Sequence, residues 1–219
     1  MPAELPEINP AGDDLLLKNP SLGMLLKILT FVLIVMFPVG LVLMFTESLR
    51  GYLWTTTIFL GLEALITFII LIKLADLLSV VITTAVIIIA SWFVEYFGVN
   101  NGIPFGSYSY THVLSPLIGG VPIAITFAWF TVAANSLLAA RYFLRGYNEI
   151  SAILIASIFI LATDILLEPF ASFINNFWIW ETSAIPIQNF VSWFVIGLIF
   201  VITFVQLKFQ KRWVHYETE

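Results

Sequence analysis

Charged residues are scarce in this sequence, at 11% of 219 residues, whereas an ordinary soluble domain has about 25%. Hydrophobic residues make up 60% of the chain and the mean hydropathy is +1.01, which excludes a water-soluble fold. The apolar residues form runs of roughly 20, the length of helix that crosses a hydrocarbon core of about 30 Å, and not the alternating pattern of a membrane β-barrel. The sequence therefore predicts an all-α polytopic membrane protein.

Cysteine is absent, which excludes disulfides, thiolate metal sites and cysteine nucleophiles. The two histidines are too few for the His-rich iron sites of membrane desaturases and hydroxylases. The sequence also lacks a G-x-S-x-G elbow, a Gly-rich phosphate loop and an H-E-x-x-H zinc motif. We therefore expect no metal and no cofactor. The net charge of -5, without a basic patch, argues against nucleic acid as a partner.

The long apolar runs predict six transmembrane helices in a single domain that covers residues 25–207. A flexible tail is expected before them at 1–24 and a cytoplasmic tail after them at 208–219. The first tail contains four prolines, and no small-residue cleavage site follows the first apolar run, so a removable signal peptide is not expected. The six predicted helices are 25–45, 53–72, 76–97, 117–138, 150–168 and 189–207.

The distribution of basic residues predicts the orientation, because cytoplasmic loops carry an excess of Lys and Arg. Of the nine basic residues, eight fall on the same side of the predicted bundle as both termini, and only Arg50 falls on the opposite side. Both termini are therefore expected in the cytoplasm, with the protein in the cell membrane. The eight basic residues on the side of the termini are Lys18, Lys27, Lys73, Arg141, Arg145, Lys208, Lys211 and Arg212.

The two longest loops, at 98–116 and 169–188, are then extracytoplasmic and contain no Lys or Arg. Both are rich in aromatic residues, glycine, proline and amides. Aromatic residues at this depth commonly form an interfacial belt. Their density beside glycine and proline favours folded re-entrant loops, and irregular backbone at membrane depth is tolerated only inside protein or around a cavity.

Four carboxylates lie in the predicted spans: Glu63, Glu95, Asp164 and Glu168. An ionisable residue there is costly and is a functional candidate by default. Asp164 and Glu168 are spaced i and i+4, on one face of the fifth helix, and Glu95 lies where the third helix reaches the same side. Glu63 should lie near the midplane, either in the site or in a separate hydrogen-bond network. Three acids and two loops therefore converge on one end of the bundle.

A carboxyl group among apolar side chains and like charges can hold a proton at neutral pH and give it to a substrate. The chemistry that this implies is general acid catalysis on an apolar molecule. The rings of Trp129 and Trp193 would stabilise a developing cation. The alternative is that these acids only specify the packing of neighbouring helices, as polar residues between membrane helices often do.

Four sequence motifs lie in order between about residues 95 and 195: E-Y-F-G-V-N-N-G-I-P-F-G-S-Y-S-Y at 95–110, G-V-P leading to A-W at 120–129, T-D-I-L-L-E-P at 163–169, and F-W-I-W-E followed by I-P-I-Q-N-F-V-S-W within 177–193. Together they resemble the carotenoid biosynthesis membrane protein family, whose best-known members are bisanhydrobacterioruberin hydratase and the carotenoid 1,2-hydratases. Glu168 stands where the family has Asp, and Ala184 and Ser192 stand where it has Gly.

The resemblance implies a hydratase that adds water to the C1,2 double bond of an acyclic (ψ) carotenoid end group. Asp164 would donate the proton, Glu168 would orient it or position water, and Glu95 would favour the protonated acid or relay protons. The substrate would be a hydrophobic carotenoid in membrane lipid, and other carotenoid-pathway enzymes are further expected partners. The expected substrate- or water-binding residues are Tyr108, Tyr110, Trp129, Glu181, Asn189, Trp193 and Glu63.

Two other functions remain open at the level of sequence. A small membrane lycopene cyclase would start with the same protonation and differ only in the capture of the cation by an internal double bond. A proton-coupled transporter would use Glu63 as its coupling residue, although no internal repeat or paired broken helix supports it. A structural role in a pigment complex belongs to the same non-enzymatic class.

Overall fold

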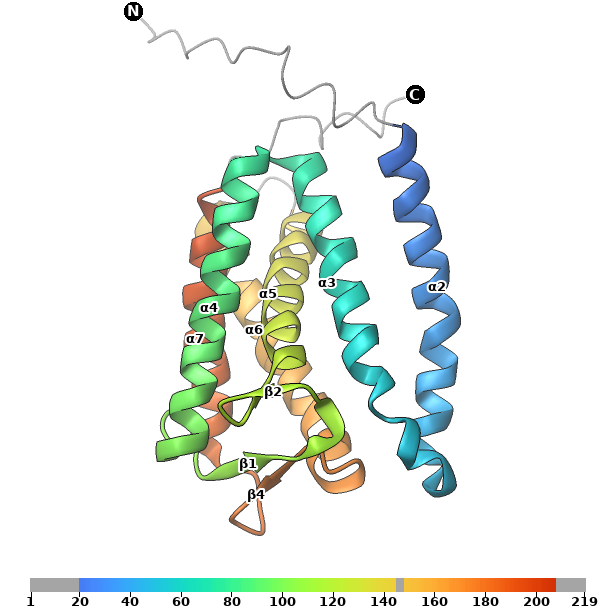
Figure 1. Cartoon of the computed structure of the whole chain (residues 1–219). Coiled ribbons are helices and arrows are strands. Elements are labelled where there is room, and N and C mark those ends of the chain that lie inside the picture. Colours follow the sequence, from blue (N-terminus) through green and yellow to red (C-terminus); the bar gives the residue numbers. More distant parts are fainter. Residues whose placement is uncertain (1–19, 145–147, 208–219) are drawn as a thin grey trace, which may run out of the picture.

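The computed structural model describes residues 20–144 and 148–207 and confirms an all-α polytopic fold with six helices long and apolar enough to cross a membrane. Consecutive helices run in opposite directions, so that the start of the first and the end of the last lie at the same end of the bundle (Figure 1). Of the predicted tail at 1–24, residues 1–19 lie outside the described residues, whereas 20–24 form the start of the first helix. The predicted tail at 208–219 also lies outside the described residues. The helices are α2 (Pro20–Phe45), α3 (Thr55–Leu74), α4 (Leu77–Asn101), α5 (Ile123–Phe143), α6 (Glu149–Glu168) and α7 (Ile187–Val205).

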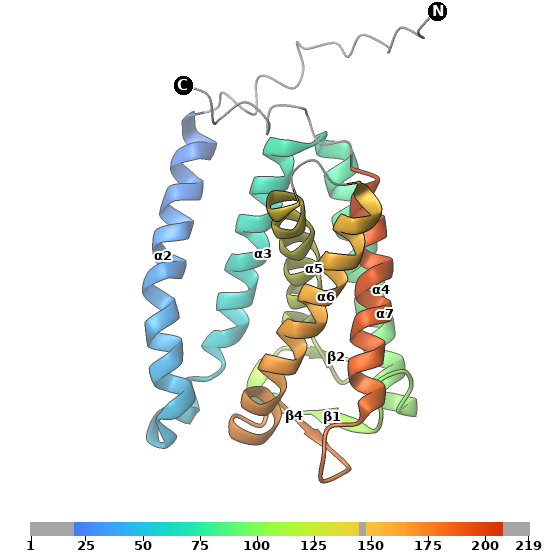
Figure 2. The ribbon, with the colours of Figure 1, turned by 180° about the vertical axis from the view of Figure 1, so that it is seen from behind.

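Helix α5 is the centre of the bundle and packs against α3, α4, α6 and α7. Many of its buried residues are small, including Ala124, Ala133, Ala134 and Ala140. Small side chains let neighbouring membrane helices approach closely, where van der Waals contact can hold them together. Helix α2 lies at the edge, against α3, and Leu43 is its one buried residue (Figures 1 and 2).

Helices α6 and α7 pack tightly at Gly197. A Cβ added to Gly197 would lie 2.9 Å from both Cδ1 and Cγ2 of Ile160. This contact holds together the two helices that carry most of the candidate site.

We expect Gly197→Leu to lower the stability of the protein by about 1–3 kcal/mol, because overpacking a close contact forces helices apart. The measurement is thermal unfolding in detergent, followed by tryptophan fluorescence. Ile160→Ala should restore part of the loss in the double variant. An unchanged midpoint for Gly197→Leu alone would contradict the close packing at this position.

Helix α5 begins at Ile123, later than the predicted residue 117, because the chain first forms a tight hairpin. Strand β2 (Leu117–Ile118) pairs with β3 (Val121–Pro122). The two residues between them, Gly119 and Gly120, have φ of 60° and 83°. Two-residue hairpin turns of this kind require positive φ and favour glycine. The hairpin packs on α4, where Trp92 donates its indole N–H to the carbonyl of Ile118 at 3.2 Å.

The two long loops meet in a second strand pair that the sequence did not predict. Strand β1 (Tyr108–Tyr110) pairs antiparallel with β4 (Trp178–Trp180), with Tyr108 opposite Trp180 and Tyr110 opposite Trp178. Successive side chains of a strand point to opposite faces, and the four aromatic residues share the inner face. We call this strand pair the ribbon. It crosses the end of the bundle opposite the ends of the described chain (Figure 1).

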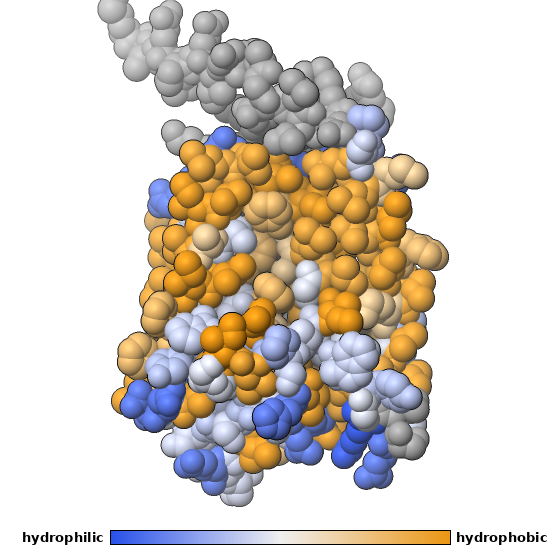
Figure 3. Space-filling view, viewed as in Figure 1, coloured by the Kyte–Doolittle hydropathy of each residue, from blue (hydrophilic) through white to orange (hydrophobic). Residues whose placement is uncertain are grey.

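The hydropathy of the surface differs between the helices and the end of the bundle that carries the ribbon. Figure 3 shows a broad apolar belt over the helices and a more polar zone at the end that carries the ribbon. Among the predicted orientation markers, Lys27, Lys73 and Arg141 belong to the opposite end, and Arg50 lies in the 3₁₀-helix η1 (Glu47–Tyr52) at the ribbon end. The markers at 18, 145, 208, 211 and 212 lie outside the described residues.

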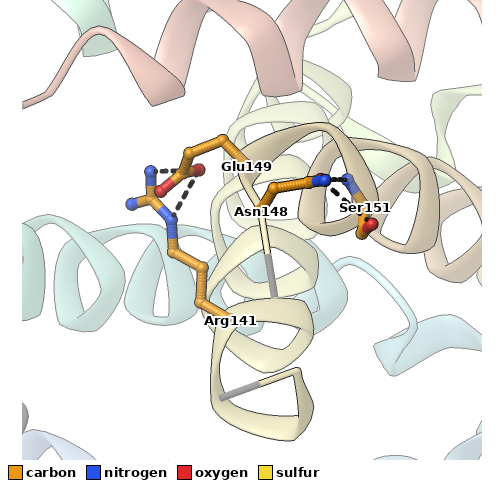
Figure 4. A network of polar contacts seen from close by, with 4 residues as sticks. All are labelled: Arg141, Asn148, Glu149 and Ser151. Carbon is orange, nitrogen blue, oxygen red and sulfur yellow. Dashed lines mark hydrogen bonds and ion pairs between the residues drawn. The ribbon is translucent and has the colours of Figure 1, made fainter. Parts of the chain in front are cut away.

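Side-chain caps begin two of the helices at the end away from the ribbon. Asp76 accepts a hydrogen bond from the Ser79 N–H at 2.9 Å, which lowers the pKa of Asp76, and so caps α4. Asn148 accepts from the N–H and hydroxyl of Ser151 and caps α6, while Arg141 pairs with Glu149 at 2.9 Å (Figure 4). This exposed ion pair contributes little to stability.

Candidate active site

Glu95 lies buried in the last third of α4 with three hydrogen-bond donors around its carboxylate. The hydroxyls of Tyr108 and Tyr110 donate to Oε2 at 2.5 and 2.8 Å, and the indole N–H of Trp129 donates to Oε1 at 2.7 Å. The donors come from the ribbon and from α5. Glu95 therefore ties three separate elements together through strong, charge-assisted bonds.

Gly98, one turn after Glu95, makes room for this cluster. A Cβ on Gly98 would lie 2.8 Å from the Tyr108 hydroxyl and 2.8 Å from the ring of Phe105. Glycine at this position therefore lets Tyr108 approach α4 closely and reach the carboxylate.

Glu168 is also fully hydrogen-bonded, at the end of α6. Trp178 and Trp180 donate their indole N–H groups to Oε2 at 3.2 and 3.1 Å, and Asn189 donates to Oε1 at 3.1 Å. The inner face of the ribbon thus supplies two donors to each of two glutamates: tyrosines from β1 to Glu95 and tryptophans from β4 to Glu168.

Asp164 differs from both glutamates in its hydrogen bonding. Its Oδ2 accepts one bond, from the amide of Asn189 at 3.0 Å. Its Oδ1 is buried and has no partner among the described residues. A protonated carboxyl group needs one oxygen that can carry and donate a proton. Asp164 has such an oxygen, whereas the oxygens of Glu95 and Glu168 are engaged by donors.

The Asn189 amide bridges the two acids of α6, because its two N–H groups go to Asp164 and Glu168. Asn189 lies in the first turn of α7, and Trp193 follows it by one turn on the same face of that helix. Trp193 stacks on Trp129, with ring centroids 3.9 Å apart and an interplanar angle of 16°. The stacked pair thus joins α5, whose Trp129 donates to Glu95, to α7, whose Asn189 donates to Asp164 and Glu168.

The chain leaves α6 through a π-helical turn, η3 (Pro169–Ile174), directly after Glu168. Proline lacks a backbone N–H and so interrupts the α-helical hydrogen bonds. The wider turn carries Ser172, whose hydroxyl donates to the carbonyl of Glu168 at 2.8 Å. Single π-turns inside helices are frequent at functional sites.

Both ribbon tyrosines stay protonated over a wide pH range. Burial raises the pKa of Tyr108 and of Tyr110 well above the ordinary value, and the neighbouring Glu95 carboxylate raises both further. Their hydroxyls therefore remain donors to Glu95.

This predicts a loss of stability in alkali. The unfolded chain releases these phenolic protons above about pH 10, whereas the folded protein keeps them, so the stabilisation is complete below that pH and falls as pH rises. Each such tyrosine contributes a slope of about 1.4 kcal/mol per pH unit. Thermal unfolding in detergent between pH 8 and 11.5 measures this, and Tyr108→Phe should show a shallower fall. Equal slopes in both proteins would contradict the prediction.

Two predicted site residues lie elsewhere. Glu181 follows β4 and its side chain is exposed, so it does not hold water in this cluster. Glu63 is half-buried in the middle of α3 and makes no hydrogen bond to the described part of the chain. No hydrogen bond among those residues therefore links Glu63 to the acid cluster or to a separate network.

Two site residues were missed from the sequence, Trp178 and Trp180. The signal was present, because W-I-W and Y-S-Y both alternate bulky aromatic residues with a spacing of two, which is typical of a strand with one buried face. Ser192, which stands where the resemblance implies Gly, donates to the carbonyl of Pro104 at 2.7 Å and so fixes the first loop to α7. Within 20–144 and 148–207, no three His, Cys, Asp or Glu side chains are grouped to hold a metal ion.

A buried acid cluster under a ribbon, in a six-helix bundle, defines this chain as a multi-pass membrane protein with an enclosed polar site. The family model described as "Carotenoid biosynthesis protein" matches residues 54–219. The chain belongs to this family, and the match includes every residue of the cluster.

The chain is also similar to a curated relative, the bisanhydrobacterioruberin hydratase of Haloarcula japonica. The two are 30% identical over 120 residues, which is 52% of this chain and 41% of the relative. This chain therefore matches less than half the length of that protein. No solved structure matches the chain.

Proposed function

We propose that this protein is a carotenoid hydratase of the cell membrane, which adds water to the C1,2 double bond of an acyclic carotenoid end group. The observation that carries the proposal is the free, buried Oδ1 of Asp164, beside two glutamates whose oxygens are already hydrogen-bonded. The similarity to a protein named as a hydratase supports the same reaction.

In the proposed reaction the proton on Asp164 Oδ1 moves to C2 of the end group, and the electrons of the double bond form the new C–H bond. The positive charge that remains at tertiary C1 is captured by the oxygen of a water molecule. That water then loses one proton, which returns to Asp164, so that the acid is regenerated and the net change is the addition of one water.

The neighbouring groups have distinct parts in this proposal. Asn189 holds Asp164 by its other oxygen and leaves Oδ1 directed at the substrate. Glu168, one turn away, carries negative charge close to the developing cation and stabilises it electrostatically. The indoles of Trp129 and Trp193 add aromatic surface near that charge.

The position of the site suits both reactants. A linear carotenoid is about as long as a bilayer core of about 30 Å is thick, so its end group lies near an interface. The acid cluster lies at one end of the bundle, next to the more polar zone of Figure 3, and water has only a short way to reach it.

The test is to express the chain in a bacterium that makes lycopene and to identify the pigments by chromatography and mass spectrometry. The expected product is heavier than lycopene by one water per modified end. An isomer of equal mass would show cyclisation, and unchanged lycopene with the protein present in the membrane would contradict both activities.

A further inference from the structure

A cavity lies between α2 and α3, outside the acid cluster. Its volume is about 340 Å³, and its walls come from α2 between Met36 and Met44 and from the segment between Tyr52 and Phe59. An apolar cavity of about 150 Å³ is enough to bind benzene, and ligand pockets begin at about 300 Å³. The cavity is large enough for a segment of an elongated apolar molecule.

The lining has the chemistry of a site for an unsaturated chain. Phe37, Phe59 and Tyr52 offer flat aromatic surface, and Met36 and Met44 offer flexible, polarisable side chains that adapt to the shape of a ligand. Dispersion attraction between such surface and a flat polyene is weak for each atom pair and adds up over the many atoms in contact.

Gly40 forms part of the wall and keeps it open. A Cβ at Gly40 would meet no heavy atom within 4 Å. A larger side chain at this position would therefore enter the cavity without forcing the backbone to move.

A contact next to the cavity reaches the turn that follows the acids of α6. Phe45, which follows Met44 of the lining, makes an edge-to-face contact with Phe170 at 5.8 Å between ring centroids. Phe170 lies two residues after Glu168, in η3. The ends of α2 and η3 lie at the same end of the bundle in both views of the ribbon (Figures 1 and 2).

We propose that this cavity binds part of the polyene chain of the carotenoid substrate while its end group is at Asp164. The inference rests on the proposed function, because the end group alone would fill only the acid site and the rest of a molecule about 30 Å long must lie along the protein or in lipid. More than half of the lining residues come from α2, which lies outside the residues matched by the family model. The cavity thus adds a substrate contact to those of the matched helices.

The test compares two variants of α2 that differ only in position. Gly40→Phe fills the cavity, whereas Gly23→Phe places the same side chain on the same helix, where an added Cβ also meets nothing within 4 Å. Each is made in the Asp164→Asn protein, which should keep substrate without converting it. The proteins are purified from carotenoid-producing cells, and the pigment bound per protein is measured by absorbance and mass spectrometry.

Gly40→Phe should lower the bound pigment roughly tenfold, and Gly23→Phe should leave it unchanged. Thr56→Leu, on the α3 wall, gives a second variant that fills the cavity if Gly40→Phe does not fold. Equal pigment in all variants, or recovery of membrane lipid in place of pigment, would overturn the inference. If Gly40→Phe loses pigment but the wild type forms no product heavier than its substrate, the result would support pigment binding in the cavity. The same result would contradict the proposed hydratase activity.

Discussion

Asp164→Asn should reduce water addition by about 10²- to 10⁴-fold, the usual contribution of a positioned general acid. The asparagine side chain has nearly the same shape and keeps an oxygen that can accept the hydrogen bond from Asn189. It cannot supply a proton to the double bond. The measurement is the yield of hydrated pigment in lycopene-producing cells at matched protein levels in the membrane.

Glu149→Gln is the matched control for this variant. Glu149 is an acid of the same helix at the opposite end, where it pairs with Arg141 on the surface (Figure 4). Its neutralisation should leave the yield of hydrated pigment unchanged. Full activity in Asp164→Asn would show that Asp164 is not the general acid, whatever the yield of hydrated pigment in Glu149→Gln.

Glu95→Gln should destabilise the protein by about 3 kcal/mol, the largest loss of stability expected here from an isosteric change. The carboxylate accepts from Tyr108, Tyr110 and Trp129. The glutamine amide turns one acceptor into a donor, so that a buried N–H or O–H group loses its partner, at about 1–3 kcal/mol for each group left unsatisfied. Thermal unfolding in detergent measures the effect.

Tyr110→Phe provides the comparison, because it removes one donor and leaves the carboxylate with two. Its expected loss is about 1 kcal/mol, the net value of a single hydrogen bond. Glu95→Gln should also release the ribbon, which would appear as faster proteolysis within 102–120. A Glu95→Gln protein as stable as the wild type would contradict the structural role of this carboxylate.

The helices and the central acids followed from the sequence because each depends on local spacing. The apolar runs have the length of a membrane span, and the four-residue spacing of Asp164 and Glu168 places both on one helical face. The start of α5 was predicted too early because Leu117 and Ile118 extend an apolar run, whereas the turn at Gly119 and Gly120 makes them a strand.

The ribbon was not predicted because its two strands are three residues long and about 70 residues apart in the chain. The alternation of aromatic residues in each strand indicates a buried face, but three residues do not identify the partner strand, which is fixed only when six helices bring the two loops together. The donors to Glu168 were missed for the same reason. The exposure of Glu181 depends on the turn that follows β4. The sequence around this acid does not indicate whether its side chain is buried or exposed.

The location of every acid of the cluster at one end of the bundle gives the proposed reaction a sidedness. A linear substrate that spans the bilayer has two chemically similar ends, and only the end at the ribbon side can reach Asp164. The new hydroxyl group then favours the interface at which it was made and resists being drawn through the hydrocarbon core. Modification of the second end requires the whole molecule to turn over or to leave and return, so the singly hydrated carotenoid should accumulate before the doubly hydrated one.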